Sequence, residues 1–273
     1  MVEEASGYDG AELVLAEQEP ATSRSLAHVD QMVSRRAQGE PLQYVLGRWE
    51  FLGHDLFVDA RVLVPRPETE VVAVVALQEA ERLGVRRGRN EPWHGVETEL
   101  AVADLGTGSG ALAIALAAEL PDAEVWATDV SDDALAVARA NFAGAGSLAA
   151  RVRVAAGSWF DALPSRLVGK LRLIVSNPPY VAEDEVAELP PEVVDWEPRR
   201  ALVSGPTGME ALAHIIERAR AWLDPASSAL VTEVAPHQAA SVVRLAKEAG
   251  FVDVHIRKDL ADRDRVLVAR TSG

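Results

Sequence analysis

The sequence contains no cysteine, few basic residues and no long apolar run, and each shortage excludes a class of protein. Without cysteine among its 273 residues there is no disulfide framework and no thiolate metal site. No apolar stretch approaches the roughly 20 residues that a membrane span needs. The first residues, Met1 to Glu4, are acidic and lack the apolar core of a signal peptide. We therefore expect a cytoplasmic protein that does not bind membranes.

The shortage of basic residues also bears on partners. The chain has 27 lysines and arginines against 42 aspartates and glutamates, a formal net charge of −15. A protein that binds duplex DNA usually presents a basic face, so the charge balance disfavours direct nucleic-acid binding. The six histidines show no ligand spacing such as His-Glu-x-x-His, and no metal site is predicted. The length allows one large domain with a small appendage.

The first part of the chain has helix-forming composition followed by a strand pattern. Residues 11–16 and 26–37 predict two helices, separated by Pro20 and a Ser/Thr cluster. Aromatic and branched residues around Gly53-His54-Asp55 then predict a β-hairpin. We predict a helical substrate-docking domain at 1–46, a β-hairpin linker at 47–66 and a main domain at 67–273.

The main domain alternates strand and helix patterns. Strands are predicted at 100–105, 124–129, 152–154, 171–176, 229–234, 251–256 and 265–269. Helices are predicted at 67–82, with Pro67 in the first turn, and at 111–120, 132–141, 209–223 and 237–249, and a charged loop at 85–98. This alternation predicts an α/β fold with a seven-stranded, doubly wound sheet. Ligands of such sheets bind at the carboxyl ends of the strands.

A nucleotide site is predicted where the first strand of this domain meets its helix. The turn Gly106-Thr107-Gly108-Ser109-Gly110 lets the backbone approach a ligand, and the helix behind it offers free N–H groups. Asp129 ends the next strand about twenty residues later, where an acid can accept hydrogen bonds from both ribose hydroxyls. Trp159 suits contact with adenine, although ordinary core packing is the alternative. NAD and S-adenosylmethionine sites share these features, so a nicotinamide enzyme stays open at this point.

A second signal is Asn177-Pro178-Pro179-Tyr180, which follows an apolar run. Such a run stopped by prolines predicts a buried parallel strand whose chain leaves the sheet at the ligand edge. The prolines hold the carbonyls of Asn177 and Pro178 as acceptors in a stiff loop, Asn177 adds a side-chain carbonyl, and Tyr180 adds a flat apolar face. This group could hold a planar NH2 by both hydrogens, which helps to localise a lone pair that is otherwise delocalised. The alternative is a simple proline-rich turn.

Four motifs, taken in their order along the chain, resemble those of a known family. They are Pro-Arg-Pro-Glu-Thr-Glu at 65–70, Asp-Leu-Gly-Thr-Gly-Ser-Gly at 104–110, Gly-Ser-Trp at 157–159 and Ser-Asn-Pro-Pro-Tyr at 176–180. From about Tyr8 onward the chain resembles the release-factor glutamine methyltransferase family (HemK/PrmC), which are class I enzymes dependent on S-adenosylmethionine. The chain differs from the usual family pattern at Arg172, Ala235 and Asp262. The family usually has a further helix ahead of Tyr8, so we expect a helical domain shortened at its start.

The resemblance implies a reaction and roles for the motif residues. The family methylates N(5), the side-chain amide nitrogen, of the glutamine in the Gly-Gly-Gln motif of peptide-chain release factors. By resemblance, residues 106–110 contact the methionine portion of S-adenosylmethionine, Asp129 the ribose and Trp159 the adenine region, and Asn177 also belongs to the cofactor site. Asn177 and the Pro178 carbonyl hold the glutamine amide, with Pro179 and Tyr180 beside it.

Three rival functions stay open. A sister group methylates a glutamine of a large-subunit ribosomal protein, and the segment Glu68-Thr69-Glu70 disfavours it. A nucleic-acid N(6)-adenine methyltransferase would share Asn-Pro-Pro-Tyr but would need a basic groove, which the net acidity disfavours. A non-enzymatic cofactor-binding module would tolerate Asn177→Ala.

Overall fold

The computed structural model describes residues 1–85 and 100–272, and its centre is a seven-stranded sheet. The strand order is β10-β11-β9-β6-β3-β4-β5. The strands are β3 (Leu100–Leu105), β4 (Ala123–Asp129), β5 (Val152–Ala156), β6 (Leu171–Ser176), β9 (Ala229–Glu233), β10 (Asp253–Lys258) and β11 (Asp264–Arg270). The five strands β3, β4, β5, β6 and β9 are parallel to one another, and β11 runs antiparallel to both β9 and β10. The predicted seven-stranded α/β fold is confirmed, while the predicted loop at 85–98 lies, from residue 86 on, outside the described residues.

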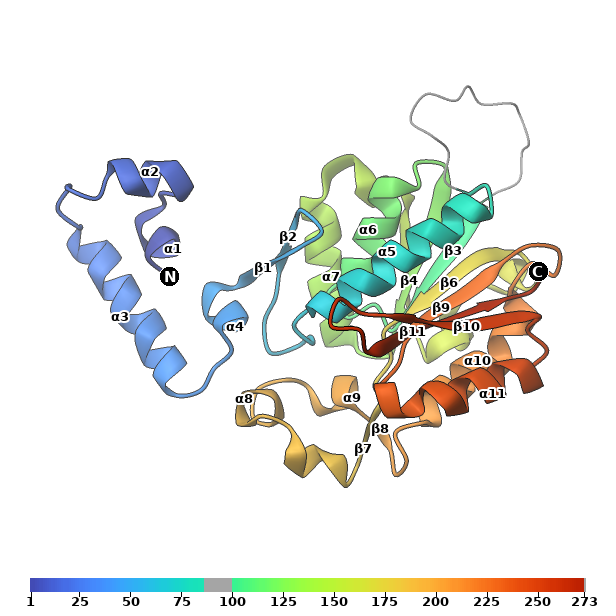
Figure 1. Cartoon of the computed structure of the whole chain (residues 1–273). Coiled ribbons are helices and arrows are strands. Elements are labelled where there is room, and N and C mark those ends of the chain that lie inside the picture. Colours follow the sequence, from blue (N-terminus) through green and yellow to red (C-terminus); the bar gives the residue numbers. More distant parts are fainter. Residues whose placement is uncertain (86–99, 273) are drawn as a thin grey trace.

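Helices cover both faces of this sheet (Figure 1). One face carries α5 (Pro67–Arg82), α6 (Ala111–Glu119) and α7 (Asp132–Gly144), and the other carries α10 (Glu210–Trp222) and α11 (Ala239–Glu248). Successive strand residues point to opposite faces, so Val102 packs with α5 and α6 while Ala103 packs with α10. Because both faces are covered, the central strands are apolar almost throughout, which explains why they were predictable.

The chain begins with four helices that lie to one side of the sheet in Figure 1. They are α1 (Val2–Ser6), α2 (Gly10–Leu15), α3 (Ser23–Ala37) and α4 (Leu42–Leu46), of which only α2 and α3 were predicted. Arg35 of α3 donates to the carbonyls of Tyr44 and Val45 at 2.9 and 3.1 Å and so fastens α3 to α4. Among the residues of α1, α2 and α3, only Met32 is buried. Polar contacts thus hold this part together more than a core does.

A β-hairpin follows, with β1 (Arg48–Phe51) paired to β2 (His54–Phe57). The prediction that Gly53-His54-Asp55 forms its turn is wrong, because the turn is Leu52-Gly53. Both turn residues have positive φ, 48° and 79°, which a two-residue type I′ turn requires and which glycine supplies at one of them. His54 and Asp55 are therefore strand residues. Asn141 of α7 accepts from the Phe57 N–H at 2.7 Å and donates to its carbonyl at 3.0 Å, which docks the hairpin on the sheet domain.

Between β6 and α10 the chain forms a small excursion that was not predicted. It contains β7 (Val181–Ala182) and β8 (Val203–Gly205), paired in parallel, with α8 (Pro191–Val194) and α9 (Arg199–Leu202) between them. Arg66, just before α5, pairs with the buried Glu197 of this excursion. Across the described ranges, no helix has both the length and the apolar composition to cross a membrane.

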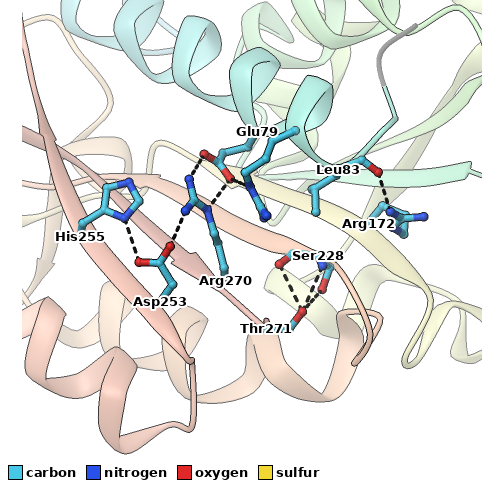
Figure 2. Close-up of polar contacts among 9 residues, drawn as sticks. Glu79, Leu83, Arg172, Ser228, Asp253, His255, Arg270 and Thr271 are labelled. Carbon is cyan, nitrogen blue, oxygen red and sulfur yellow. Dashed lines mark hydrogen bonds and ion pairs between the residues drawn. The ribbon is translucent and has the colours of Figure 1, made fainter. Parts of the chain in front are cut away.

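At the other end of the sheet, where the parallel strands begin, polar contacts join α5 to β10 and β11 (Figure 2). Arg270 donates two hydrogen bonds, of 2.8 and 2.6 Å, to the carboxylate of Glu79, which is only 3% exposed. Arg172 donates to the carbonyls of Ser227 and Leu83, both at 2.8 Å, so its charge at a strand start is satisfied by backbone.

Asp262, in the turn between β10 and β11, has φ 60°, a left-handed conformation that aspartate tolerates and glycine prefers.

Candidate active site

The carboxyl ends of four parallel strands meet at one edge of the sheet and line or support a single cavity. β3 leads to Gly106, β4 ends at Asp129, β6 leads to Asn177 and β9 ends at Glu233. Eight of the predicted site residues line the cavity: Gly106, Thr107, Gly108, Ser109, Asp129, Trp159, Asn177 and Pro179. The glycine-rich turn at 106–110 and the Asn-Pro-Pro-Tyr loop at 177–180 thus open onto one space.

Three predicted site residues, Gly110, Pro178 and Tyr180, are not among the described residues that line the cavity. A Cβ on Gly110 would lie 2.8 Å from the Phe142 ring, so this glycine lets α6 pack closely against α7. Pro178 is buried in the loop. The Tyr180 hydroxyl donates to Glu233, another residue that is not among the described lining residues, at 3.2 Å.

The glycine-rich turn is fixed by its own hydrogen bonds and by Asp104 beneath it. The N–H groups of Gly106 and Thr107 both donate to the Thr128 carbonyl, at 2.9 and 2.8 Å. Asp104 accepts from the Thr107 hydroxyl at 2.6 Å and from the Ala113 N–H at 3.1 Å. Burial raises the pKa of Asp104 to about 7, helped by the nearby Asp129 carboxylate. Its second oxygen, Oδ1, is buried and has no partner among the described residues, which leaves an acceptor beside the turn.

Asp129 stands at the end of β4 in a fixed orientation. Its carboxylate accepts from the Ser131 N–H at 2.9 Å and from the Gly108 N–H at 3.0 Å. Burial raises its pKa, while these bonds and the positive charge of Arg200 oppose the rise. A carboxylate has about four acceptor positions, so Asp129 can still accept from ligand hydroxyls.

Trp159 lines the cavity with its ring close to Gly106 of the glycine-rich turn. Its backbone has φ 48°, a left-handed conformation that is unusual for an aromatic residue. A Cβ on Gly106 would lie 3.1 Å from the Trp159 ring, so glycine is needed there for the ring to approach. Such strain at a cavity wall is typical of functional sites. The ring offers a flat apolar surface to a ligand at the strand ends.

Asn177 is the first member of a buried hydrogen-bonded chain. Its Nδ2 donates to the Thr69 hydroxyl at 2.9 Å, and that hydroxyl donates to Glu233 Oε2 at 3.0 Å. The Tyr180 hydroxyl donates to the other oxygen, Oε1, at 3.2 Å. Burial raises the pKa of Glu233 to about 7 and raises that of Tyr180 as well. Asn177 Oδ1 receives no hydrogen bond from the described residues, so it is available to a ligand NH2.

Sequence reasoning missed Thr69, Glu233, Arg200 and Arg61. Thr69 falls in the 65–70 motif, which was used as a mark of the family and given no role in the site, and it lines the cavity. Glu233 is the last residue of β9 and the next-to-last residue of the predicted strand 229–234, and an acid in that position was the available signal. Arg200 and Arg61 line the cavity from α9 and from the segment after the hairpin, where no motif marks them.

Two family models match the sequence. Residues 94–195 match the model described as "Methyltransferase small domain", and residues 1–47 match the model described as "PrmC N-terminal domain".

Curated relatives match over nearly the whole chain. A protein of Bordetella pertussis named "Release factor glutamine methyltransferase" is 40% identical over 97% of this chain and 91% of its own length. The proteins of the same name from Geobacter sulfurreducens and Salmonella typhimurium are 36% and 39% identical, over 97% and 92% of this chain and 86% and 83% of theirs.

Solved structures agree in fold at low identity. The hMettl16 catalytic domain superposes with a TM-score of 0.59 at 17% identity, covering 85% of this chain and 79% of that one. A methyltransferase from Pyrococcus furiosus superposes with a TM-score of 0.54, also at 17% identity, covering 92% of this chain and all of that one. At these identities the similarity shows the class I methyltransferase fold alone.

Proposed function

The chain belongs to the release factor glutamine methyltransferase family, and we propose that it transfers a methyl group from S-adenosylmethionine to N(5) of the glutamine in the Gly-Gly-Gln motif of peptide-chain release factors. The single observation that carries the proposal is the convergence described above. Asn177, with a free side-chain carbonyl, shares a cavity with the glycine-rich turn and Asp129. An acceptor for an amide NH2 therefore stands next to a nucleotide-type site.

The residues at the glycine-rich turn fit S-adenosylmethionine by their chemistry. Asp129 would hold the ribose hydroxyls, and Trp159 would lie along the adenine region. The unpartnered Oδ1 of Asp104 gives an acceptor close to the turn, where the methionine portion with its ammonium group would lie. When bound, the cofactor supplies an electrophilic methyl group. The cavity wall between these polar groups is largely apolar, with Leu63 and Leu112 among its residues, which favours exclusion of water from a sulfonium.

The Asn-Pro-Pro-Tyr loop would prepare the acceptor nitrogen. An amide nitrogen is a poor nucleophile because its lone pair is delocalised into the carbonyl. If Asn177 Oδ1 and the Pro178 carbonyl accept its two hydrogens, the lone pair is directed toward the cofactor side of the cavity. No strong base is then required before methyl transfer, and much of the rate comes from alignment of the reacting atoms. Tyr180, held by Glu233, would keep the loop in this shape.

We assign release-factor docking to the helical part of the chain, at 1–46, with the hairpin segment 47–66 linking it to the catalytic part at 67–273. Two observations support this assignment. The match to the PrmC N-terminal domain covers residues 1–47. Large apolar side chains are also exposed on these helices, among them Val14 at 71%, Leu15 at 84% and Leu26 at 55%. In a segment with so small a core, these exposed apolar side chains are available for contact with a protein partner.

The test is transfer of labelled methyl from S-adenosylmethionine to four acceptors in parallel. These are an intact release factor, the same factor with Gln→Ala in its Gly-Gly-Gln motif, a large-subunit ribosomal protein and duplex DNA. Label on the intact release factor alone is the expected result. Label on the ribosomal protein or on DNA would contradict the proposed acceptor while leaving the family and the fold in place.

A further inference from the structure

We propose that Thr69 and Glu233 are positioning residues that fix which way round the Asn177 side-chain amide stands, so that its carbonyl oxygen faces the acceptor amide. The inference rests on the proposed function, because it explains how the acceptor NH2 is recognised. It gives a role to Glu233, which lies outside every motif, and to Thr69, whose motif at 65–70 was given no role in the site. Glu233 does not line the cavity in the part of the chain that the structure describes, so it acts only through its neighbours.

The contacts form one continuous chain from the cavity into the protein. Asn177 Nδ2 and Thr69 Oγ1 are 2.9 Å apart, and Thr69 Oγ1 and Glu233 Oε2 are 3.0 Å apart. Thr69 is 4% exposed and Glu233 is 1% exposed, so the bond between these two side chains is shielded from water. The three residues come from the loop after β6, from α5 and from β9. A helix and a strand therefore hold Thr69 and Glu233, and Asn177 directly follows the last residue of a central strand.

The direction of every bond follows from the carboxylate. An ionised carboxylate can only accept, and a hydroxyl has a single proton to give. The Thr69 proton therefore goes to Glu233, and the Thr69 oxygen must accept from its other neighbour. That requirement turns the NH2 of Asn177 toward Thr69 and its Oδ1 toward the cavity. The acceptor amide then meets an oxygen instead of a second NH2.

Protonation of Glu233 would remove this directionality. A protonated carboxyl can donate to Thr69, whose own proton is then free for Asn177 Oδ1, and the Asn177 amide turns over. Its NH2 would then face the NH2 of the acceptor, and the clamp would be lost. The charged and titratable groups that face Glu233 are Glu68 from α5, Arg265 from β11 and Tyr180 from the loop after β6.

These surroundings bring the change into an accessible pH range. Burial and the negative charge of Glu68 raise the pKa of Glu233, and Arg265 with the two hydroxyl donors opposes them, which leaves it at about 7. The clamp is therefore set for catalysis above about pH 7 and is lost as the pH falls through that value. The glutamine acceptor itself does not titrate in this range, so it adds no pH dependence of its own to kcat.

A matched pair of variants tests the Thr69 step. Thr69→Val keeps the shape and loses the hydroxyl, while Thr69→Ser keeps the hydroxyl. With the full-length enzyme and a release factor, we expect Thr69→Val to lower kcat by roughly 10- to 100-fold, the usual effect of leaving a buried polar group misdirected. The Kd for S-adenosylmethionine should change by less than about threefold, and Thr69→Ser should restore most of kcat. Equal kcat in the two variants would overturn the proposal.

The Glu233 step is tested by the pH profile of kcat. The wild type should lose activity as pH falls below about 7, whereas Glu233→Gln, which has no proton to gain, should keep a lower but flat kcat between about pH 6 and 8. An unchanged acid limb in Glu233→Gln would overturn the role of Glu233 and would assign the limb to Asp104, whose pKa is also about 7.

The two levels of the account fail in different ways. If wild-type enzyme methylates no release factor, the proposed function itself is wrong. If the wild type does methylate it, but Thr69→Val and Thr69→Ser have equal kcat and Glu233→Gln loses activity at low pH as the wild type does, only the positioning chain is wrong. Melting temperatures of each variant show whether a loss of activity comes from unfolding.

Discussion

Replacing Asn177 by alanine separates methyl transfer from cofactor binding more sharply than any other change in this site. The substitution removes Oδ1, the acceptor proposed for the glutamine NH2, and leaves the Thr69 hydroxyl without its donor. Loss of one group that is pre-oriented toward the reacting centre typically lowers kcat by about 10²- to 10³-fold. We expect a loss of that size.

Cofactor affinity should behave differently in this variant. The groups proposed to hold S-adenosylmethionine, Asp129 and the turn at 106–110, make no hydrogen bond to Asn177 within the described structure. The Kd for S-adenosylmethionine should therefore stay within about threefold of the wild type. Asp129→Asn is the reciprocal variant, since it removes a charge from the proposed ribose site and should raise that Kd by about 10-fold, the loss of one charge-assisted hydrogen bond.

The assay is calorimetric titration of S-adenosylmethionine into each variant, followed by single-turnover methyl transfer at saturating cofactor. Saturation removes the affinity effect, so Asp129→Asn should recover most of its rate while Asn177→Ala should not. Equal loss of cofactor affinity in the two variants would refute this division of roles. Full transfer activity in Asn177→Ala would refute the amide clamp itself.

Two further predictions concern stability away from the acceptor loop. Arg270→Ala would leave the buried Glu79 with Arg82 as its remaining ion-pair partner among the described residues, and should lower the free energy of unfolding by about 3 kcal/mol without changing kcat. Urea denaturation measures this loss, and an unchanged midpoint would contradict it. Buried Glu233 and Asp104, whose pKa values folding raises to about 7, bind more protons in the folded protein than in the unfolded chain between about pH 4 and 7. Their contribution to stability therefore falls as pH rises through that window, so the melting temperature should be higher at pH 6 than at pH 8. Glu233→Gln should reduce that difference, and an unchanged difference would contradict the assignment.

The sequence predicted the central strands well for a physical reason. Strands covered on both faces are apolar throughout, and β6 occupies residues 171–176 as predicted. Short elements were missed, among them α4 and the β7–β8 pair, because five or fewer residues give no readable period. The hairpin turn was misplaced because Gly53 indicates a turn but does not show whether the other turn residue precedes or follows it.

The candidate site was predictable in part. Residues next to each other in a motif, such as the turn at 106–110, could be assigned from their local pattern. The chain from Asn177 to Thr69 and Glu233 could not, because Thr69 and Glu233 are 164 positions apart and meet only when α5 crosses the sheet beside β9. Pairings of that kind depend on tertiary packing, which no window of sequence contains.

The central claim is that this enzyme methylates a glutamine side-chain amide held by Asn177. The most direct measurement is mass spectrometry of a release factor after incubation with enzyme and S-adenosylmethionine, with fragmentation to locate the methyl group. The account predicts one methyl group on the glutamine of the Gly-Gly-Gln motif with the wild-type enzyme, and none with Asn177→Ala. A methyl group on any other residue, or an equal yield from the variant, would contradict it.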